Sequence, residues 1–206
     1  MKRRTCLAVI LTVMLFCVVG CQNETGSTSK PGTDDANRNA DGQTKAGEVT
    51  NEVTVTVASW EEVQQMVAGH AGKVVVIDLW STWCVPCVRE FPNLVKLQDK
   101  FPDEVACISV NLNYDGSADA TPASHRDAVL KFLTKKGAGF QNVICSDPDE
   151  EMYTQLDLGS IPAIYVYDAQ GKVHKRFDND SGEYGEEGFT YKDHVIPLVE
   201  ELLAKP

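Results

Sequence analysis

The alternation of apolar and polar residues divides most of the chain into strands and helices. Strands are expected where the two kinds alternate, or where a short apolar run is bounded by turn residues. This predicts strands over residues 53–57, 73–80, 104–112, 142–145, 163–167 and 172–177. Apolar residues at helical spacing predict helices over residues 88–101, 124–136, 147–156 and 189–204, and a further helix starting at Ser59.

Capping and turn residues support several of these boundaries. Ser59 with Glu62 fits a capping box at the start of the first helix. Gly137 is placed to end the helix before it, and residues 168–171 fit a hairpin turn. Pro92 lies inside a predicted helix and is expected to kink it.

The resulting order of elements is β-α-β-α-β-α-β-α-β-β-α. Alternating strands and helices imply parallel pairing, because each helix carries the chain back to start the next strand. The final hairpin adds an antiparallel edge. We therefore predict an α/β domain with a mixed sheet over residues 53–206.

Two segments precede this domain. Residues 1–20 combine a basic start with an apolar run too short to span a membrane comfortably, which is the pattern of an export signal. The run ends in Val-Val-Gly-Cys at residues 18–21, which resembles the lipobox of bacterial lipoproteins. That resemblance implies cleavage before Cys21 and lipid on Cys21; the alternatives are an uncleaved anchor or an ordinary secretory signal. Residues 21–52 contain no aromatic residue and are predicted to form a flexible tether.

Charge and cysteine content narrow the possible partners. The chain has 30 acidic and 19 basic residues and a formal net charge of -11, which argues against nucleic acid and anionic lipid surfaces as partners. Of seven cysteines, Cys6 and Cys17 would leave with the signal. An exported protein works where disulfides persist, so the cysteines of the domain are candidates for redox chemistry.

Cys84 and Cys87 lie where the strand over 73–80 turns into a helix. A thiol at a helix N-terminus has a lowered pKa, because unpaired N–H groups and the helix dipole favour an anion there, and the thiolate is the nucleophile. Cys87 follows one turn later and can form a disulfide with Cys84. Taken alone, the spacing also fits half of a zinc site or a structural bridge.

The remaining residues do not favour metal or haem chemistry at this pair. Zinc needs further ligands, and the four histidines have no paired spacing: His70, His125, His174 and His194. Haem attachment needs a histidine after the second cysteine, where Val88 stands. We therefore expect no metal and no cofactor.

Other polar and thiol residues have simpler interpretations. Cys107 and Cys145 lie in predicted buried strands and are expected to be free thiols rather than a second disulfide. The loop over residues 178–188 contains Asp178, Asp180 and Glu183, but its glycine spacing misses the EF-hand pattern. A solvated loop is therefore favoured over a Ca²⁺ site.

From Val53 onward the chain resembles thioredoxin-fold proteins, and among them the TlpA/ResA-like thiol-disulfide reductases of bacterial membranes. The resemblance is carried by Asp-Leu-Trp-Ser-Thr-Trp-Cys-Val-Pro-Cys at 78–87, Arg-Glu-Phe-Pro at 89–92, Ile-Pro at 161–162 and Asp-Ala-Gln-Gly-Lys at 168–172. It implies a thioredoxin fold with helices on both sheet faces, an N-terminal extension and an inserted strand and helix. Where that family often has Val-Asn-Val-Gly-Glu, residues 110–114 read Val-Asn-Leu-Asn-Tyr, so the acid is absent or replaced by Asp115.

The resemblance also implies roles for the residues at the active site. Cys84 would be the nucleophile that forms a mixed disulfide with substrate, and Cys87 the resolving thiol. Asp78 would be the buried acid, with a raised pKa, that takes the proton of Cys87. A cis peptide at Ile161–Pro162 would leave the Ile161 backbone free to pair with an extended substrate.

The residues around the cysteines complete the expected substrate surface. Trp83 would shield one side of the site, and Val85 and Pro86 lie between the cysteines. Pro86 also suits the first turn of a helix and influences the redox potential in this family.

These inferences predict an extracytoplasmic, lipid-anchored, monomeric thiol-disulfide oxidoreductase that reduces protein disulfides. A membrane thiol-disulfide carrier would supply its electrons, and apocytochrome c maturation is the family's commonest substrate class. One alternative is a thiol peroxidase, which needs Thr-x-x-Cys, whereas Thr82 stands only two residues before Cys84. The other is a non-catalytic module that binds a partner through the groove at Ile161–Pro162 and the acidic loop.

Overall fold

The computed structural model describes residues 52–205. The predicted export signal (1–20), its lipidation site at Cys21 and nearly all of the predicted tether (21–52) therefore lie outside the described residues. Within the described part of the chain, no helix is both long and apolar enough to cross a membrane.

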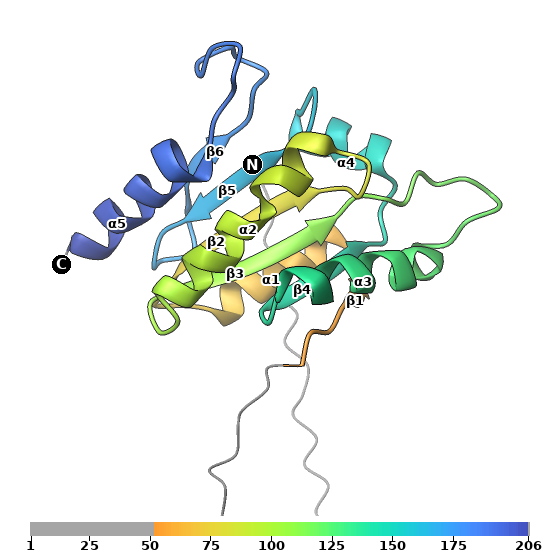
Figure 1. Cartoon of the computed structure of the whole chain (residues 1–206), viewed down its shortest axis with the longest axis horizontal. Coiled ribbons are helices and arrows are strands. Elements are labelled where there is room, and N and C mark those ends of the chain that lie inside the picture. The colour runs from red at the N-terminus through yellow and green to blue at the C-terminus, as the bar shows by residue number, and fades with distance from the viewer. Residues whose placement is uncertain (1–51, 206) are drawn as a thin grey trace, which may run out of the picture. The chain divides into compact units, whose positions relative to one another are not determined.

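A single six-stranded sheet forms the centre of the domain (Figure 1). The strands are β1 (Thr56–Ala58), β2 (Val74–Trp80), β3 (Val105–Asn111), β4 (Gln141–Cys145), β5 (Ala163–Tyr167) and β6 (Val173–Phe177). They lie in the order β1-β4-β3-β2-β5-β6. β1 to β4, β4 to β3 and β3 to β2 pair in parallel, whereas β5 pairs antiparallel with both β2 and β6. The predicted mixed sheet is confirmed.

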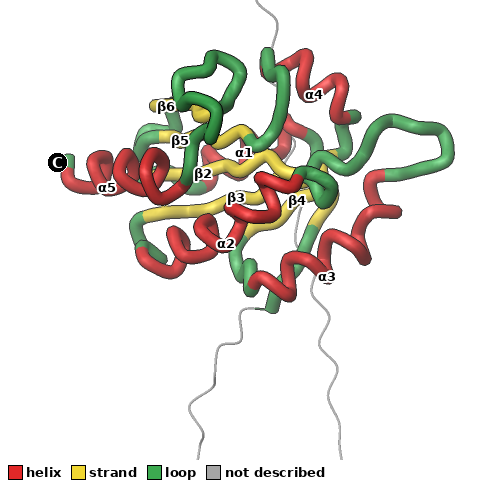
Figure 2. Tube along the Cα trace, turned by 45° about the horizontal axis from the view of Figure 1, so that its top comes forward, coloured by secondary structure: helices red, strands yellow, loops and turns green. Residues whose placement is uncertain are grey.

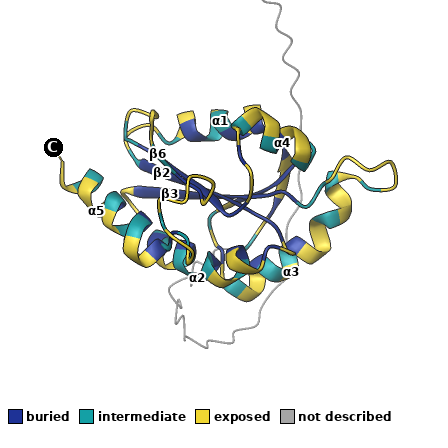
Figure 3. Ribbon diagram, turned by 90° about the horizontal axis from the view of Figure 1, so that it is seen from above, coloured by how far each residue is buried: buried dark blue, intermediate teal, exposed yellow. Residues whose placement is uncertain are grey.

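Helices cover both faces of this sheet. They are α1 (Trp60–Gly69), α2 (Val85–Lys100), α3 (Arg126–Lys136), α4 (Asp149–Leu156) and α5 (Ile196–Ala204). α1 and α4 lie on one face, and α2, α3 and α5 on the other (Figure 3). The thioredoxin-like α/β fold expected from the sequence is therefore present.

β2 is the strand that positions the candidate site. All seven of its residues are buried, because it lies between β3 and β5 and is covered on both faces. Its last residue, Trp80, packs against Phe91 of α2 and Phe132 of α3, with ring centroids 4.9 and 4.6 Å apart. This aromatic cluster fixes the start of α2 over the carboxyl end of β2.

Several local signals act as the sequence predicts. Ser59 and Glu62 form the capping box of α1. Gly137 ends α3 with a left-handed φ of 71°, a conformation that glycine adopts without strain. α2 differs from its predicted start, because it begins at Val85 rather than at residue 88; it ends at Lys100, and Pro92 lies inside it.

The first strand and the last helix also differ from their predicted bounds. The first strand covers only Thr56–Ala58, and Val57 is 37% exposed while Val55 is buried. β1 is an edge strand that pairs with β4, so little of its surface is covered. The alternation of valines therefore does not predict which of its residues are buried. The last helix begins with a π-helical turn over Tyr191–Val195 before α5. Figure 2 shows the long irregular segments that follow β3 and β6.

Candidate active site

The Cys-Val-Pro-Cys segment lies at the carboxyl end of β2 and starts α2. Cys84 is the N-cap residue of that helix and forms a disulfide with Cys87. The Cys87 N–H donates to Cys84 Sγ over 3.3 Å, and the Cys84 N–H is held by Ser81 Oγ at 3.2 Å. The Cys87 N–H of the first helical turn therefore points at Cys84 Sγ, where it would stabilise a thiolate.

The surface around the disulfide is apolar and open. Both cysteines are buried, but Trp83 is 58% exposed and Val85 76% exposed. Pro86, which lacks an N–H, occupies the first turn of α2, where no intrahelical donor is needed. Exposed large apolar side chains beside a reactive group are suited to contact a partner.

The Ile161–Pro162 peptide bond is cis and lies beside the disulfide. Cys84 Sγ is 3.6 Å from the Ile161 carbonyl oxygen, although the two residues are 77 positions apart. The pairing of β5 with β2 explains this approach, since Ala163 directly follows the cis bond and pairs with Leu79. The structure thus brings together the cysteines and the Ile-Pro segment, as the resemblance implies.

Asp78 is buried on the face of β2 that α2 covers. It is 3% exposed, and its Oδ2 accepts a hydrogen bond of 2.7 Å from the Tyr191 hydroxyl. Its Oδ1 has no hydrogen-bond partner among the described residues. Burial raises the pKa of Asp78 to about 7, the Tyr191 hydrogen bond opposes that rise, and the charge of Glu90 adds to it. A carboxyl with this pKa can take up or release a proton near neutral pH.

Tyr191 and Glu90 are site residues that the sequence does not identify. Tyr191 comes from the π-helical turn before α5, and its N–H donates to Glu90 Oε2 over 3.3 Å. The side chain of Glu90, on α2, is only 17% exposed. In the sequence, Tyr191 is only an aromatic residue within an amphipathic segment. Nothing in that pattern indicates that its hydroxyl contacts Asp78.

Asn113 takes the place of the glycine in the Val-Asn-Val-Gly-Glu motif that TlpA/ResA-like proteins often have. The Thr82 N–H donates to Asn113 Oδ1, and Asn113 Nδ2 donates to Thr82 Oγ1, both over 2.9 Å. Asp115 is exposed and accepts from the Ser117 N–H in its own loop. Asp115 therefore does not replace the missing acid, and the amide of Asn113 instead holds the loop before Cys84.

Cys107 and Cys145 are free and buried, as favoured by the sequence. Cys107 Sγ lies 3.9 Å from the Leu94 carbonyl oxygen of α2, whereas Cys145 Sγ lies 3.8 Å from Asp147 Oδ2. The two thiols lie on opposite sheet faces, which rules out a bond between them without rearrangement. Burial raises the pKa of Cys107 strongly and that of Cys145 to about 12.

Most residues of the acidic loop after β6 are exposed, as the sequence predicts, but Asp178 is buried. Asp178 is only 8% exposed, because its Oδ2 pairs with Arg176 Nε at 2.6 Å. Asp180 accepts hydrogen bonds from residues 159 and 160, and Glu183 pairs with Lys175. Across residues 52–205, no three His, Cys, Asp or Glu side chains gather as a metal site would require.

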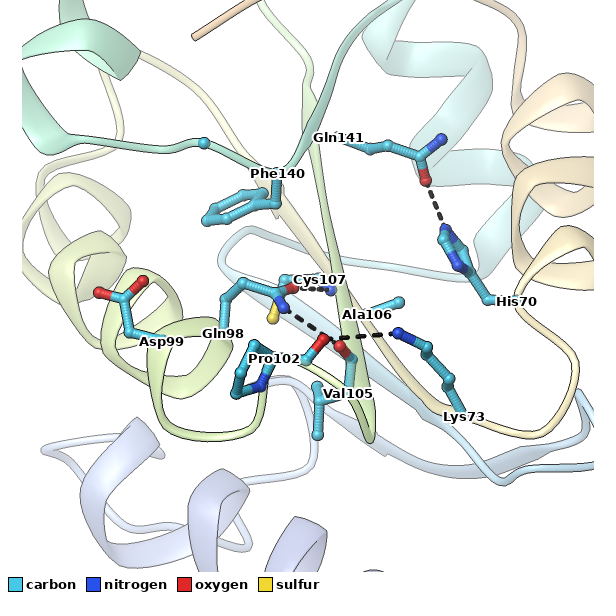
Figure 4. A pocket seen from close by; sticks show the side chains of 11 residues that line it. His70, Lys73, Gln98, Asp99, Pro102, Val105, Ala106, Cys107, Phe140 and Gln141 are labelled. Atoms are coloured by element: carbon cyan, nitrogen blue, oxygen red, sulfur yellow. Dashed lines mark hydrogen bonds between the residues drawn. The ribbon is translucent and has the colours of Figure 1, made fainter. Parts of the chain in front are cut away.

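A pocket of about 420 Å³ lies at the opposite end of the sheet (Figure 4). Lys73 and Val105, at the amino ends of β2 and β3, line it together with Cys107. His70 and Gln141 close one side through a 2.7 Å hydrogen bond. Of the predicted site residues that the structure describes, none lines this pocket.

Comparisons with known proteins identify the family of this chain. Residues 45–189 match the family model described as Redoxin. Thiol-disulfide oxidoreductase ResA of Bacillus subtilis (strain 168) is 29% identical over 105 residues, which are 50% of this chain and 52% of ResA. Thioredoxin-like protein YneN of the same organism is 45% identical over 106 residues, 50% of this chain and 54% of YneN. The chain thus spans about half the length of these relatives.

Among solved structures, a secreted disulfide oxidoreductase of Mycobacterium tuberculosis has a similar fold. The TM-score is 0.50 at 20% identity, and the match covers 76% of this chain and all of that one. At this identity the likeness concerns the fold alone.

Proposed function

This chain belongs to the redoxin family, and from that premise we propose that it is a thiol-disulfide oxidoreductase that reduces disulfides in protein substrates. The observation that carries the proposal is the position of Cys84. It forms a disulfide with Cys87, caps α2, and lies 3.6 Å from the carbonyl oxygen of Ile161 at a cis Ile-Pro bond. A nucleophile, a resolving thiol and a backbone edge for substrate therefore lie at one point of the surface.

The reaction starts from the reduced dithiol. The Cys84 thiolate attacks one sulfur of the substrate disulfide, forms a mixed disulfide and expels the other substrate sulfur as a thiolate. Cys87, once deprotonated, attacks Cys84 Sγ and releases the second substrate sulfur. Two electrons pass from the dithiol to the substrate, and the two substrate thiolates take up protons.

Asp78 is the proposed proton acceptor for Cys87. The carboxyl lies on the face of β2 that α2 covers, and it has a pKa of about 7 because of its burial. At neutral pH a fraction of the carboxyl is ionised and able to accept a proton. Tyr191 holds one carboxylate oxygen, while the Oδ1 atom keeps its lone pairs unused within the described residues.

The wider setting is proposed from the sequence. The export signal over 1–20 would direct the chain out of the cytoplasm and then be removed. The lipid on Cys21 and the tether over 21–52 would hold a monomeric domain of residues 53–206 at a membrane. A membrane thiol-disulfide carrier would reduce the Cys84–Cys87 disulfide again. The name of ResA, a thiol-disulfide oxidoreductase, supports the chemistry. Apocytochrome c is the substrate class proposed from the family resemblance.

The reduction potential of the dithiol tests the proposal and gives its direction. Trp83 flanks the disulfide, so tryptophan fluorescence should follow oxidation of the full chain in thiol redox buffers. A potential near or below about −270 mV would support a reductant, and one near about −120 mV would make the protein an oxidant. Absence of any reversible two-electron transition would refute the enzymatic proposal.

Two cysteine variants separate catalysis from binding. Cys84→Ser should abolish disulfide exchange, whereas Cys87→Ala should accumulate mixed disulfides, since it can attack but cannot resolve. A Cys84→Ser chain with full biological function would instead support the non-catalytic binding module. Rapid turnover of hydrogen peroxide by the wild type would favour the peroxidase.

A further inference from the structure

The acidic loop after β6 contacts the segment that leads into the cis proline. Asp180 Oδ2 accepts a hydrogen bond of 2.7 Å from the Gly159 N–H, and the Ser160 hydroxyl donates to Asp180 Oδ1 over 3.2 Å. Residues 159 and 160 immediately precede Ile161. One carboxylate therefore holds both residues through which the chain enters the cis bond.

The close approach depends on glycine at position 159. A Cβ atom placed on Gly159 would lie 2.9 Å from Asp180 Oδ1 and 3.2 Å from its Cγ. Any other residue there would push the carboxylate away or shift the backbone. The sequences of the two segments are thus matched to each other, although they are 21 residues apart.

The loop that presents Asp180 is itself fixed to the fold. The Asp180 N–H donates to Asp178 Oδ1 over 3.0 Å, and Asp178 Oδ2 pairs with Arg176 Nε of β6 at 2.6 Å. The Arg176 Nη1 group donates to the carbonyl oxygens of Leu156 and Asp157 at the end of α4. These bonds join β6, the loop and the end of α4 into a frame around residues 156–160.

We propose that Asp180 is a positioning residue for substrate: by holding Gly159 and Ser160 it fixes the Ile161 backbone beside Cys84, so that an extended substrate strand can pair there. This inference rests on the proposed function. A protein or peptide disulfide has to align its backbone with Ile161, whereas a small aromatic disulfide needs only to reach the Cys84 sulfur. Asp180 therefore acts on substrate selection rather than on the thiol chemistry.

The test compares two substrates in the full chain. Insulin presents its disulfides on a polypeptide, and 5,5′-dithiobis(2-nitrobenzoate) is a small disulfide. In Asp180→Ala, kcat/KM for insulin should fall about tenfold or more, the scale of a lost hydrogen bond to a charged group. The rate with the small disulfide should change by less than about twofold, because exposure of the thiol is unaltered. Asp180→Asn keeps an acceptor for the Gly159 N–H and should recover part of the insulin activity.

The matched control is Glu183→Gln, which removes one negative charge from the same loop. Glu183 pairs with Lys175 and makes no hydrogen bond to residues 156–162. It should leave both rates unchanged. The inference would be overturned if Asp180→Ala lowered the rate equally with both substrates, or with neither. It would also be overturned if Glu183→Gln lowered the rate with insulin as much as Asp180→Ala does. A wild type that reduces neither substrate would instead refute the proposed function, and the inference with it.

Discussion

Replacing Asp78 with Asn is expected to make the oxidised protein more stable above neutral pH and slower to resolve mixed disulfides. The carboxyl is buried, accepts one hydrogen bond from Tyr191 and leaves its Oδ1 without a partner among the described residues. Burial therefore raises the pKa of Asp78 from 3.8 to about 7. Asn has nearly the same shape and can accept the same hydrogen bond, but it has no charge to bury.

Proton linkage gives the sign and the size of this change in the free energy of unfolding. Below pH 4 the carboxyl is protonated in both the folded and the unfolded chain, so the pKa difference has no effect. Between about pH 4 and 7 the folded protein keeps a proton that the unfolded chain has lost, so the free energy of unfolding decreases as pH rises. The difference between a pKa of 3.8 and one of about 7 corresponds to a loss of ~4 kcal/mol in the free energy of unfolding, complete above the folded pKa. The Asn variant does not lose this stability.

Denaturant unfolding of the oxidised protein, followed by tryptophan fluorescence from pH 4 to 8.5, measures the effect. The stability difference between Asp78→Asn and wild type should grow by up to ~4 kcal/mol up to about pH 7 and then level off. Asp103→Asn is the control, because Asp103 is exposed and its substitution should give a flat difference. A flat difference for Asp78→Asn would refute the buried, proton-binding carboxyl.

The same variant tests the proton transfer. Loss of the acceptor should slow the intramolecular step, in which Cys87 attacks the mixed disulfide, by about 10²-fold or more. The wild-type rate should rise with pH through an inflection near pH 7, as Asp78 ionises. Rapid-quench analysis of the mixed disulfide gives this rate. An unchanged pH profile in Asp78→Asn would show that another group accepts the proton.

Two substitutions at the site and one labelling experiment on the buried thiols test further expectations. Tyr191→Phe removes the hydrogen bond that lowers the pKa of Asp78, so the inflection in the pH dependence of the resolution rate should move to higher pH. The control Tyr167→Phe, on the other face of the sheet, should leave the inflection where it is. Asn113→Ala removes two hydrogen bonds to the loop before the cysteines and should lower stability by about 1 kcal/mol and slow exchange, as denaturant unfolding and insulin reduction would report. Cys107 and Cys145 should resist iodoacetamide in the folded protein at pH 8, because burial raises the pKa of both thiols, and peptide mass mapping should find them alkylated only after unfolding.

The order of elements could be predicted because it depends on local patterns. The capping box at Ser59 and the left-handed Gly137 each act within a few residues of where they stand in the chain. The edge strand β1 was placed too early, because three residues of pairing with β4 give it little burial to pattern. The π-helical turn before α5 was also missed, since helical periodicity does not separate it from the helix that follows.

Some residues of the candidate site could also be predicted from local patterns, and others could not. Cys84, Cys87 and Asp78 belong to one continuous strand and helix, so a motif names them together. Tyr191 is 113 residues from Asp78, and only the packing of the turn before α5 brings its hydroxyl to the carboxyl. Neither periodicity nor spacing carries that information.

The error at Asp178 has a related cause. A run of acids predicts solvation, because an isolated charge is costly to bury. Here Arg176, two residues earlier, pairs with Asp178 and makes burial possible, and the buried acid then holds the Asp180 N–H. The segments after β6 thus supply Tyr191, which donates to Asp78, and Asp180, which accepts hydrogen bonds from residues 159 and 160. If the proposed roles of Asp78 and Asp180 hold, a chain that kept the cysteine motif and the Ile-Pro bond but changed these later segments is expected to differ in proton transfer and in substrate alignment.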